Sequence, residues 1–248
     1  MKLTIIGCAG SFPGPDSSAS CYLLQHDGTS ILLDLGNGSL GSLARHIDPF
    51  EVSAVALSHL HIDHCADVAS LYVGRKWQPD GPLPPIPVAG PEGVGDRMAN
   101  IYGLPLDVGM KEQFDFIDYD HAPVEFGPFM ITPFLVNHCV VSYGLRVEAG
   151  GRTLVFSGDT GACQNLIDNS VGADLALYEA SYLSRRENPP DMHLTGKEAA
   201  ELANAAGVKR LILTHLVAWY DSEEVLAEAM GLFSGDVELA KPGMVVEI

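Results

Sequence analysis

The sequence predicts an α/β protein in which two β-sheets pack face to face and helices cover both outer faces, a four-layer αββα sandwich. Two observations support this fold class. Short runs rich in β-branched and aliphatic residues follow one another through the N-terminal part, with turn residues between them. Later in the chain, similar runs alternate with helical patterns, which is typical of strands joined by helical crossovers.

The first group of predicted strands is interrupted by clusters of Gly, Pro, Asp and Ser, which break regular structure. These strands are expected at residues 3–7, 21–25, 31–35 and 54–58. Helices are expected at residues 41–46, 66–76 and 93–102. The proline-rich segment 80–87 is interpreted as a loop between the last two helices.

The second group of predicted strands covers residues 129–136, 143–148, 153–157, 173–179 and 210–214. A helix is expected before the last of them. Thr195 and Glu198 have the spacing of a capping box, in which both side chains satisfy free N–H groups at a helix start. An alanine-rich stretch follows, and Gly207 marks its end.

Composition favours one globular domain that spans residues 1–248, because hydrophobic residues make up 47% of the chain and charged residues 19%. The 32 acidic and 14 basic residues give a net charge of -18. Such a surface repels phosphate backbones, so extended nucleic acid is a poor default partner. A small anionic substrate stays open, since bound divalent cations make a pocket locally positive.

The five cysteines show no paired CxxC spacing, which fits a reducing, cytoplasmic location. Cys65 and Cys139 each follow a histidine. A thiolate ligand is one reading of these two residues, and a small buried side chain is the preferred one. No apolar run approaches the roughly 18 residues of a membrane helix, and residues 1–6 fit a first strand better than a signal peptide.

A dense group of metal-binding side chains follows the predicted strand 54–58. Three histidines and one aspartate lie within residues 59–64, and nitrogen and oxygen donors suit borderline divalent metals. Three further candidates each lie just beyond another predicted strand. The seven candidate ligands are His59, His61, Asp63, His64, His138, Asp159 and His215. Bringing these groups together without a cation is costly. By contrast, His26, His46 and His121 are expected at the surface.

The order His-x-His-x-Asp-His, then His138, Gly-Asp159-Thr and Thr-His215, resembles the metallo-β-lactamase superfamily. The resemblance implies one metal held by His59, His61 and His138, and a second held by Asp63, His64 and His215. Asp159 would bridge the two metals. Zinc is the expected metal, and manganese or iron are alternatives that nitrogen and oxygen ligands also accept.

A narrower resemblance involves Ala-Ser-Tyr182 and Met-His-Leu-Thr-Gly-Lys-Glu-Ala-Ala200, which are similar to the ribonuclease Z branch. It implies that His193 contacts the scissile phosphate and helps the leaving oxygen depart, while Glu179 orients it. Asp63 would orient or deprotonate the water that the two metals activate to hydroxide. The glycine-rich turns 7–14 and 34–38 also match turns that support the metal rim, or they serve only to bend the chain.

The expected substrate is a small phosphodiester. Only 20 residues separate His138 from Asp159, so the protruding arm that grips tRNA in ribonuclease Z is absent there. Segments Gly-Pro-Asp-Ser-Ser-Ala-Ser20 and Pro-Pro-Asp-Met-His193 resemble actinobacterial cyclic nucleotide phosphodiesterases, which implies 3',5'-cyclic AMP.

Several alternatives remain. They are a ribonuclease Z-type tRNA 3' endonuclease and a thioester or lactone hydrolase, because a fold does not fix its substrate. A non-enzymatic binding module is disfavoured, since it would be expected to lack ligands. A homodimer formed through residues 71–77 or 216–220 also stays open.

Overall fold

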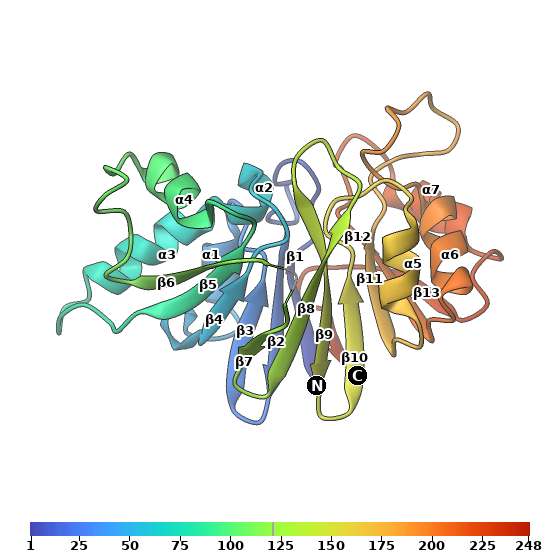
Figure 1. Ribbon diagram of the computed structural model, residues 1–248. Helices are drawn as coiled ribbons and strands as arrows, with labels where there is room; N and C mark the ends of the chain where they lie inside the picture. The colour runs from blue at the N-terminus through green and yellow to red at the C-terminus, as the bar shows by residue number, and fades with distance from the viewer. Residues whose placement is uncertain (121) are drawn as a thin grey trace.

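Two seven-stranded mixed sheets form the centre of the molecule (Figure 1). The computed structural model describes residues 1–120 and 122–248, so the expectation for His121 lies outside the described residues. The sheets pack face to face, and helices lie on the outer face of each one. This arrangement confirms the four-layer αββα architecture expected from the sequence.

The first sheet has the strand order β14-β1-β2-β3-β4-β5-β6. Antiparallel pairs join β14, β1, β2 and β3, and parallel pairs join β3 to β6. The strands are β1 (Lys2–Gly7), β2 (Cys21–His26), β3 (Thr29–Leu33), β4 (Ala54–Ala56), β5 (Ile86–Gly90), β6 (Phe114–Asp118) and β14 (Val245–Glu247).

The second sheet has the strand order β13-β12-β11-β10-β9-β8-β7. Its parallel half, β10 to β13, delivers several strand ends to the same edge. The strands are β7 (Val124–Phe126), β8 (Phe129–Val136), β9 (Ser142–Ala149), β10 (Arg152–Phe156), β11 (Leu175–Glu179), β12 (Arg210–Thr214) and β13 (Asp236–Leu239).

Alternation of side chains along each strand builds three layers of core. In β1, Leu3 and Ile5 belong to the cluster between the sheets, whereas Ile6 packs towards the helices. In β10, Leu154 faces inward and Val155 packs against the helices of its own side. Successive residues of a strand point to opposite faces, so a strand buried on both faces reads as continuously apolar.

The helices divide evenly between the two outer faces (Figure 1). Helices α1 (Ser39–Leu43), α3 (Asp67–Lys76) and α4 (Val94–Tyr102) pack on the first sheet. Helices α5 (Gln164–Ser170), α6 (Gly196–Ala205) and α7 (Ser222–Ala229) pack on the second sheet. Two short elements, η1 (Pro49–Glu51) and α2 (Ile62–Cys65), complete the set. Within the described residues, none of these helices has both the length and the apolar character needed to cross a bilayer.

All nine strands expected from the sequence are present, with bounds that agree to within two residues. The capping box at Thr195 is confirmed: its hydroxyl accepts from the N–H of Glu198, whose carboxylate accepts from the N–H of Thr195. The loop expected at 80–87 is wrong at its end, because Ile86 and Pro87 begin strand β5 between β4 and β6.

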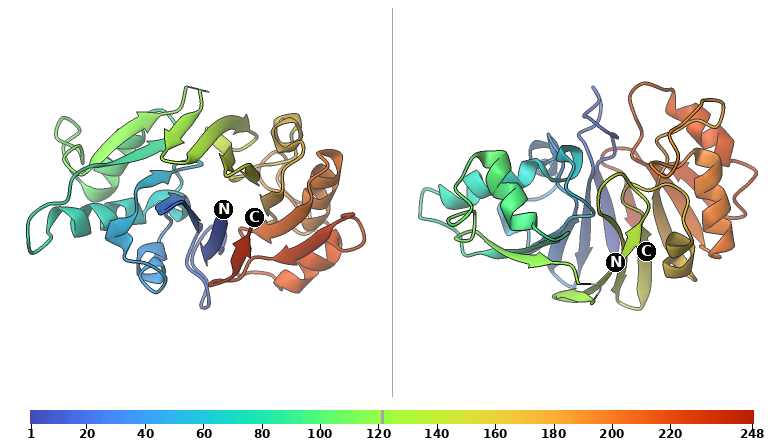
Figure 2. Two further views of the ribbon diagram at one scale, coloured as in Figure 1. Left: turned by 90° about the horizontal axis from the view of Figure 1, so that it is seen from below. Right: turned by 45° about the horizontal axis from the view of Figure 1, so that its top comes forward.

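The two ends of the chain lie side by side (Figure 2). The N–H of Ile248 donates to the carbonyl of Met1 at 2.9 Å. Strand β14 therefore closes against β1, and residues from both ends of the sequence share one core.

The two segments considered for a homodimer each expose a tryptophan. Trp77 and Trp219 have 70% and 67% of their surface exposed. Leu71 and Val217, from the same two segments, are buried. These segments are therefore partly core, and the homodimer stays a prediction.

Candidate metal centre

Loops that follow four strands bring the predicted ligands to one place. His59 and His61 follow β4, and the short helix α2 adds Asp63 and His64. The other three ligands follow β8, β10 and β12, as the sequence predicted: they are His138, Asp159 and His215. Residues 62–65 of the first ligand segment form one helical turn, α2.

The first group of ligand atoms is centred on Nδ1 of His61. This atom lies 3.0 Å from Nε2 of His59 and 3.3 Å from Nε2 of His138. Asp159 completes the group: its Oδ2 lies 3.7 Å from Nε2 of His59 and 4.0 Å from Nε2 of His138. These four residues form one candidate metal site.

The second group surrounds His64 and uses the other oxygen of the same aspartate. Nε2 of His64 lies 3.2 Å from Nε2 of His215 and 3.2 Å from Oδ1 of Asp159. Oδ2 of Asp63 lies 3.2 Å from Nε2 of His215. Asp159 thus directs one carboxylate oxygen to each group, which is the bridging position that the resemblance implied.

The spacing of these atoms fits divalent cations. Nitrogen ligands about 2.0–2.1 Å from a tetrahedral metal lie about 3.3 Å from one another, which matches the spacings around His61 and His64. The donors are five imidazole nitrogens and two carboxylates, a set that accepts zinc and other borderline metals. The two groups are consistent with a dinuclear metal site.

Four of the histidines have a partner for the ring nitrogen that faces away from the ligand group. Nδ1–H donates to a neighbouring oxygen, which leaves Nε2 with a free lone pair directed inward. The pairs are His59 with Oγ of Ser58 (3.1 Å), His64 with Oδ2 of Asp34 (2.7 Å), His138 with the carbonyl of Met192 (2.8 Å) and His215 with Oγ of Ser181 (2.7 Å). Lone pairs that converge in this way repel one another unless a cation lies between them.

The carboxylates around His64, in the second group of ligand atoms, also favour a positive charge at this place. Burial disfavours the charged form of His64, but the carboxylates of Asp159 and Asp34 outweigh burial and raise its pKa well above the usual range. Oδ1 of Asp159 is buried without a hydrogen-bond partner among the described residues. In the absence of metal a proton would supply this charge, so metal binding displaces protons from the site.

His193 lies beside the two groups and is held by a buried glutamate. Its Nδ1 donates to Oε1 of Glu179 at 2.7 Å. Burial alone lowers the pKa of His193, but the Glu179 and Asp159 carboxylates more than compensate and raise it to about 9. These carboxylates therefore favour the imidazolium form at neutral pH.

Glu179 is fully buried and connects His193 to a predicted metal ligand. Oε1 also accepts from the N–H of Thr160 at 2.8 Å. Oε2 accepts from the N–H and the hydroxyl of Ser181, and that hydroxyl in turn accepts from Nδ1 of His215. One carboxylate thus orients both histidines.

Two cavities meet at His193. The first, about 390 Å³, is the metal pocket: it opens over His61, Asp63, His138 and Asp159. The second, about 490 Å³, also has His193 in its lining and is called the side pocket. It is lined by polar and charged groups, among them Tyr182, Asn188 and Lys197. A substrate with its reacting group over the metals can extend into either cavity.

The glycine-rich turns support the rim, as the resemblance suggested. A Cβ on Gly36 would lie 1.9 Å from the carbonyl oxygen of Asp63, and a Cβ on Gly10 would lie 2.5 Å from that of His215. No side chain fits at either place. His215 itself has a φ of 55°, a left-handed conformation that a non-glycine residue adopts only when its surroundings enforce it.

The cysteines and histidines outside the ligand groups differ in their exposure to solvent. Cys65 is buried, as expected, whereas Cys139 is exposed, so the expectation of a buried side chain there is wrong. The loop after β8 carries Cys139 outward, with its Sγ 3.6 Å from Nε2 of His138. His46 is exposed, and His26 is half-buried.

Sequence reasoning did not assign a role to Asp34. This buried carboxylate accepts from the N–H and hydroxyl of Ser58, from the hydroxyl of Ser20 and from Nδ1 of His64. Its sequence signal was available, because Asp34 directly follows strand β3 just as the ligands follow other strands. Ser181 has the same signal, since it follows strand β11 by two residues and belongs to the Ala-Ser-Tyr182 segment.

Replacing Asp34 by asparagine is expected to weaken zinc binding about 10–100-fold, because the amide is uncharged and keeps only one acceptor oxygen for the Ser58 N–H and the His64 Nδ1–H, which now bond to different oxygens. Competition with a chromogenic chelator measures this change. Asp174→Asn is the matched control: Asp174 accepts from the N–H of Thr153 away from the ligand groups, and its variant should bind zinc as the parent does. Equal zinc affinity in both variants would show that Asp34 does not support His64.

Comparison with known proteins agrees with the fold and the ligand groups. A family model described as "Beta-lactamase superfamily domain" matches residues 29–216. The chain therefore belongs to the β-lactamase superfamily and has the metallo-β-lactamase fold.

Relatives refine this assignment. The uncharacterized protein ML1173 of Mycobacterium leprae is 42% identical over 100% of this chain and 89% of its own length. The probable metallo-hydrolase YhfI of Bacillus subtilis is 32% identical over 100% of both chains, and its crystal structure matches with a TM-score of 0.89 over 99% of each chain. Ribonuclease Z of Mycolicibacterium gilvum is 28% identical over 88% of this chain and 84% of its own length.

Proposed function

We propose that this chain is a metal-dependent phosphodiesterase that hydrolyses a small phosphodiester, with 3',5'-cyclic AMP as the first candidate. One observation carries the proposal: His193, charged at neutral pH and held by buried Glu179, stands beside two ligand groups that suit a dinuclear site. A cationic acid next to two metals suits an anionic phosphoryl group and a poor alkoxide leaving group.

Different residues of the site would perform the separate parts of such a reaction. Two divalent cations at the ligand groups would activate water and neutralise charge that develops on the phosphoryl oxygens. Asp63 lines the metal pocket and is placed to orient the attacking water. His193 lines both cavities, so it can protonate the leaving oxygen at their junction. Glu179 keeps the His193 ring oriented and its proton in place.

A tRNA substrate is less well supported. The interval between His138 and Asp159 holds only β9 and β10, joined by a tight turn at Gly150 and Gly151. No segment in that interval can act as an arm, and the net charge of -18 opposes RNA binding. The similarity to a ribonuclease Z supports phosphodiester chemistry but leaves the size of the substrate open.

Thioester or lactone hydrolysis is the second candidate. The same seven ligands serve it equally well, and a fold does not determine its substrate. A neutral acyl substrate, however, has no phosphoryl charge for a protonated His193 to neutralise. The His193–Glu179 pair therefore favours the phosphodiester.

One assay separates these candidates. Protein loaded with zinc or manganese is offered 3',5'-cyclic AMP, a precursor tRNA, and a thioester and a lactone in parallel, with His193→Ala as the comparison. The proposal expects hydrolysis of the cyclic nucleotide that depends on His193. Cleavage of tRNA alone would reject the small substrate, and activity on the acyl substrates alone would reject phosphodiester chemistry.

A further inference from the structure

Arg97 is the only arginine or lysine that lines the metal pocket, within the part of the chain that the structure describes. It lies on helix α4, which packs against the first sheet. The rest of the lining consists of the histidines and aspartates of the site together with Ser11, Ile62, Cys139 and Met192. Arg97 thus places a positive charge in the lining of this pocket.

One end of the guanidinium is anchored. Nε of Arg97 donates to the carbonyl of Leu60 at 3.2 Å, and Leu60 lies between the ligands His59 and His61. The half-buried side chain is thereby fixed relative to the ligand groups. No hydrogen bond occupies its two terminal amino groups in the described part of the chain, and they are not among the buried unpartnered atoms. They are therefore open to a ligand in the pocket.

Arg97 also lacks an acidic partner among the described residues, although the chain is strongly acidic. Several surface arginines and lysines elsewhere pair with carboxylates. Examples are Arg146 with Glu148, Arg152 and Lys209 with Asp174, and Arg185 with Glu224. Among the described residues that line the metal pocket, the only carboxylates are Asp63 and Asp159, and both face histidines. The charge of Arg97 is left uncompensated.

The side pocket has the opposite character. Among the described residues its lining includes three acidic side chains, Asp191, Glu198 and Glu201, against two basic ones, Lys197, which pairs with Glu201 at 3.8 Å, and His193, which pairs with Glu179. An anionic group is repelled there and attracted on the Arg97 side. The charges of the two cavities therefore favour one orientation of a bound substrate, with its anionic group in the metal pocket rather than in the side pocket.

We propose that Arg97 binds the anionic oxygens of the substrate and makes the metal pocket select phosphorylated substrates over neutral ones. This inference rests on the proposed phosphodiesterase function and specifies how the substrate is recognised. A guanidinium presents its amino groups as a fork that matches two phosphoryl oxygens, whereas a lysine offers only a point charge. The uncharged part of the substrate then extends into the side pocket.

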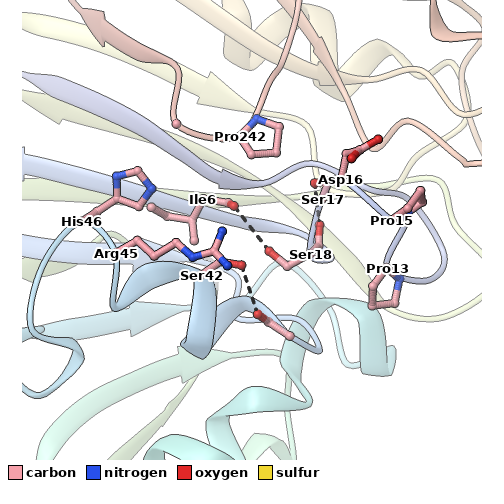
Figure 3. Close-up of a pocket in the computed structure, with 13 residues that line it drawn as sticks. Ile6, Pro13, Pro15, Asp16, Ser17, Ser18, Ser42, Arg45, His46 and Pro242 are labelled. Atoms are coloured by element: carbon pink, nitrogen blue, oxygen red, sulfur yellow. Dashed lines mark hydrogen bonds between the residues drawn. The ribbon is translucent and has the colours of Figure 1, made fainter.

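A second arginine provides a matched control. Arg45 lines a different cavity, of about 340 Å³, together with His46, Ser42 and Pro242 (Figure 3). Its side chain is exposed and, like Arg97, has no acidic partner among the described residues. That cavity contains none of the predicted metal ligands, so Arg45→Met removes the same charge elsewhere on the molecule.

The test measures binding of inorganic phosphate to the zinc-loaded full chain by calorimetry, without turnover. Arg97→Met is expected to weaken phosphate binding about tenfold or more, because a charge-assisted pair is lost. Arg97→Lys should fall between it and the parent, and Arg45→Met should match the parent. Zinc content, measured by mass spectrometry, should equal that of the parent in all three variants.

Two results would overturn the inference. Unchanged phosphate affinity in Arg97→Met would show that Arg97 does not bind the anion. Loss of zinc from both Arg97 variants would show that the arginine only supports the ligand loop through Leu60. If the parent hydrolyses no phosphodiester yet binds phosphate in an Arg97-dependent way, the proposed function fails and the anion site stands.

Discussion

Replacing His193 by alanine is expected to lower kcat on a phosphodiester about 10²–10⁴-fold while the bound metal is retained. The acid that protonates the leaving oxygen is lost, but none of the seven predicted ligands is touched. With a pKa of about 9, His193 is charged below that pH and loses its proton above it. The kcat of the parent should therefore fall as pH rises through about 9, and the alanine variant should lack this limb.

The pH profile distinguishes an acid from a merely structural histidine. His46→Ala, at an exposed position, should keep both the rate and the alkaline limb of the parent. A His193 variant that loses rate equally at every pH and also loses zinc would mean that His193 stabilises the site rather than protonates the leaving group.

Replacing Asp159 by alanine is expected to have the largest effect, because its two oxygens face both ligand groups. We expect loss of tight metal binding and a fall in kcat/KM of at least about 10³-fold, which corresponds to about 4 kcal/mol of transition-state stabilisation. Metal content and activity are measured on the same preparation.

The melting temperature provides an independent test of the bridging role of Asp159. A ligand that binds only the folded state raises the melting temperature, so zinc should raise the Tm of the parent and not that of Asp159→Ala. Asp168→Ala removes an exposed carboxylate from helix α5 and should behave as the parent does. A zinc-dependent rise in Tm that persists in the Asp159 variant would contradict the bridging role.

Much of the ligand set could be predicted because its signal is local. Each ligand follows an apolar strand, and the ends of neighbouring strands meet at one edge of a sheet, so the pattern of His138, Asp159 and His215 carries spatial information. Asp34 has the same signal but stood alone, without a second metal-binding residue near it in sequence. Its role appeared only when the fold brought it to His64.

Other features depend on tertiary contacts that local sequence patterns do not indicate. The carbonyl of Met192 orients His138 through a backbone atom that every residue has. In the sequence, Arg97 is an ordinary polar residue of an amphipathic helix. Only the packing of that helix brings Arg97 into the lining of the metal pocket. Strand β5 begins at Ile86 and Pro87, where proline favours a loop and the flanking strands override that preference.

The hydrogen bonds of Glu179 connect the proposed proton donor with a predicted metal ligand. Through one oxygen it sets the acidity of His193, and through the other, by way of Ser181, it orients His215. With His193 as the proposed proton donor, a change of metal at His215 is expected to alter its acidity. Zinc-loaded and manganese-loaded protein should differ in the pH at which activity declines, so the choice of metal also sets the alkaline limit of the enzyme.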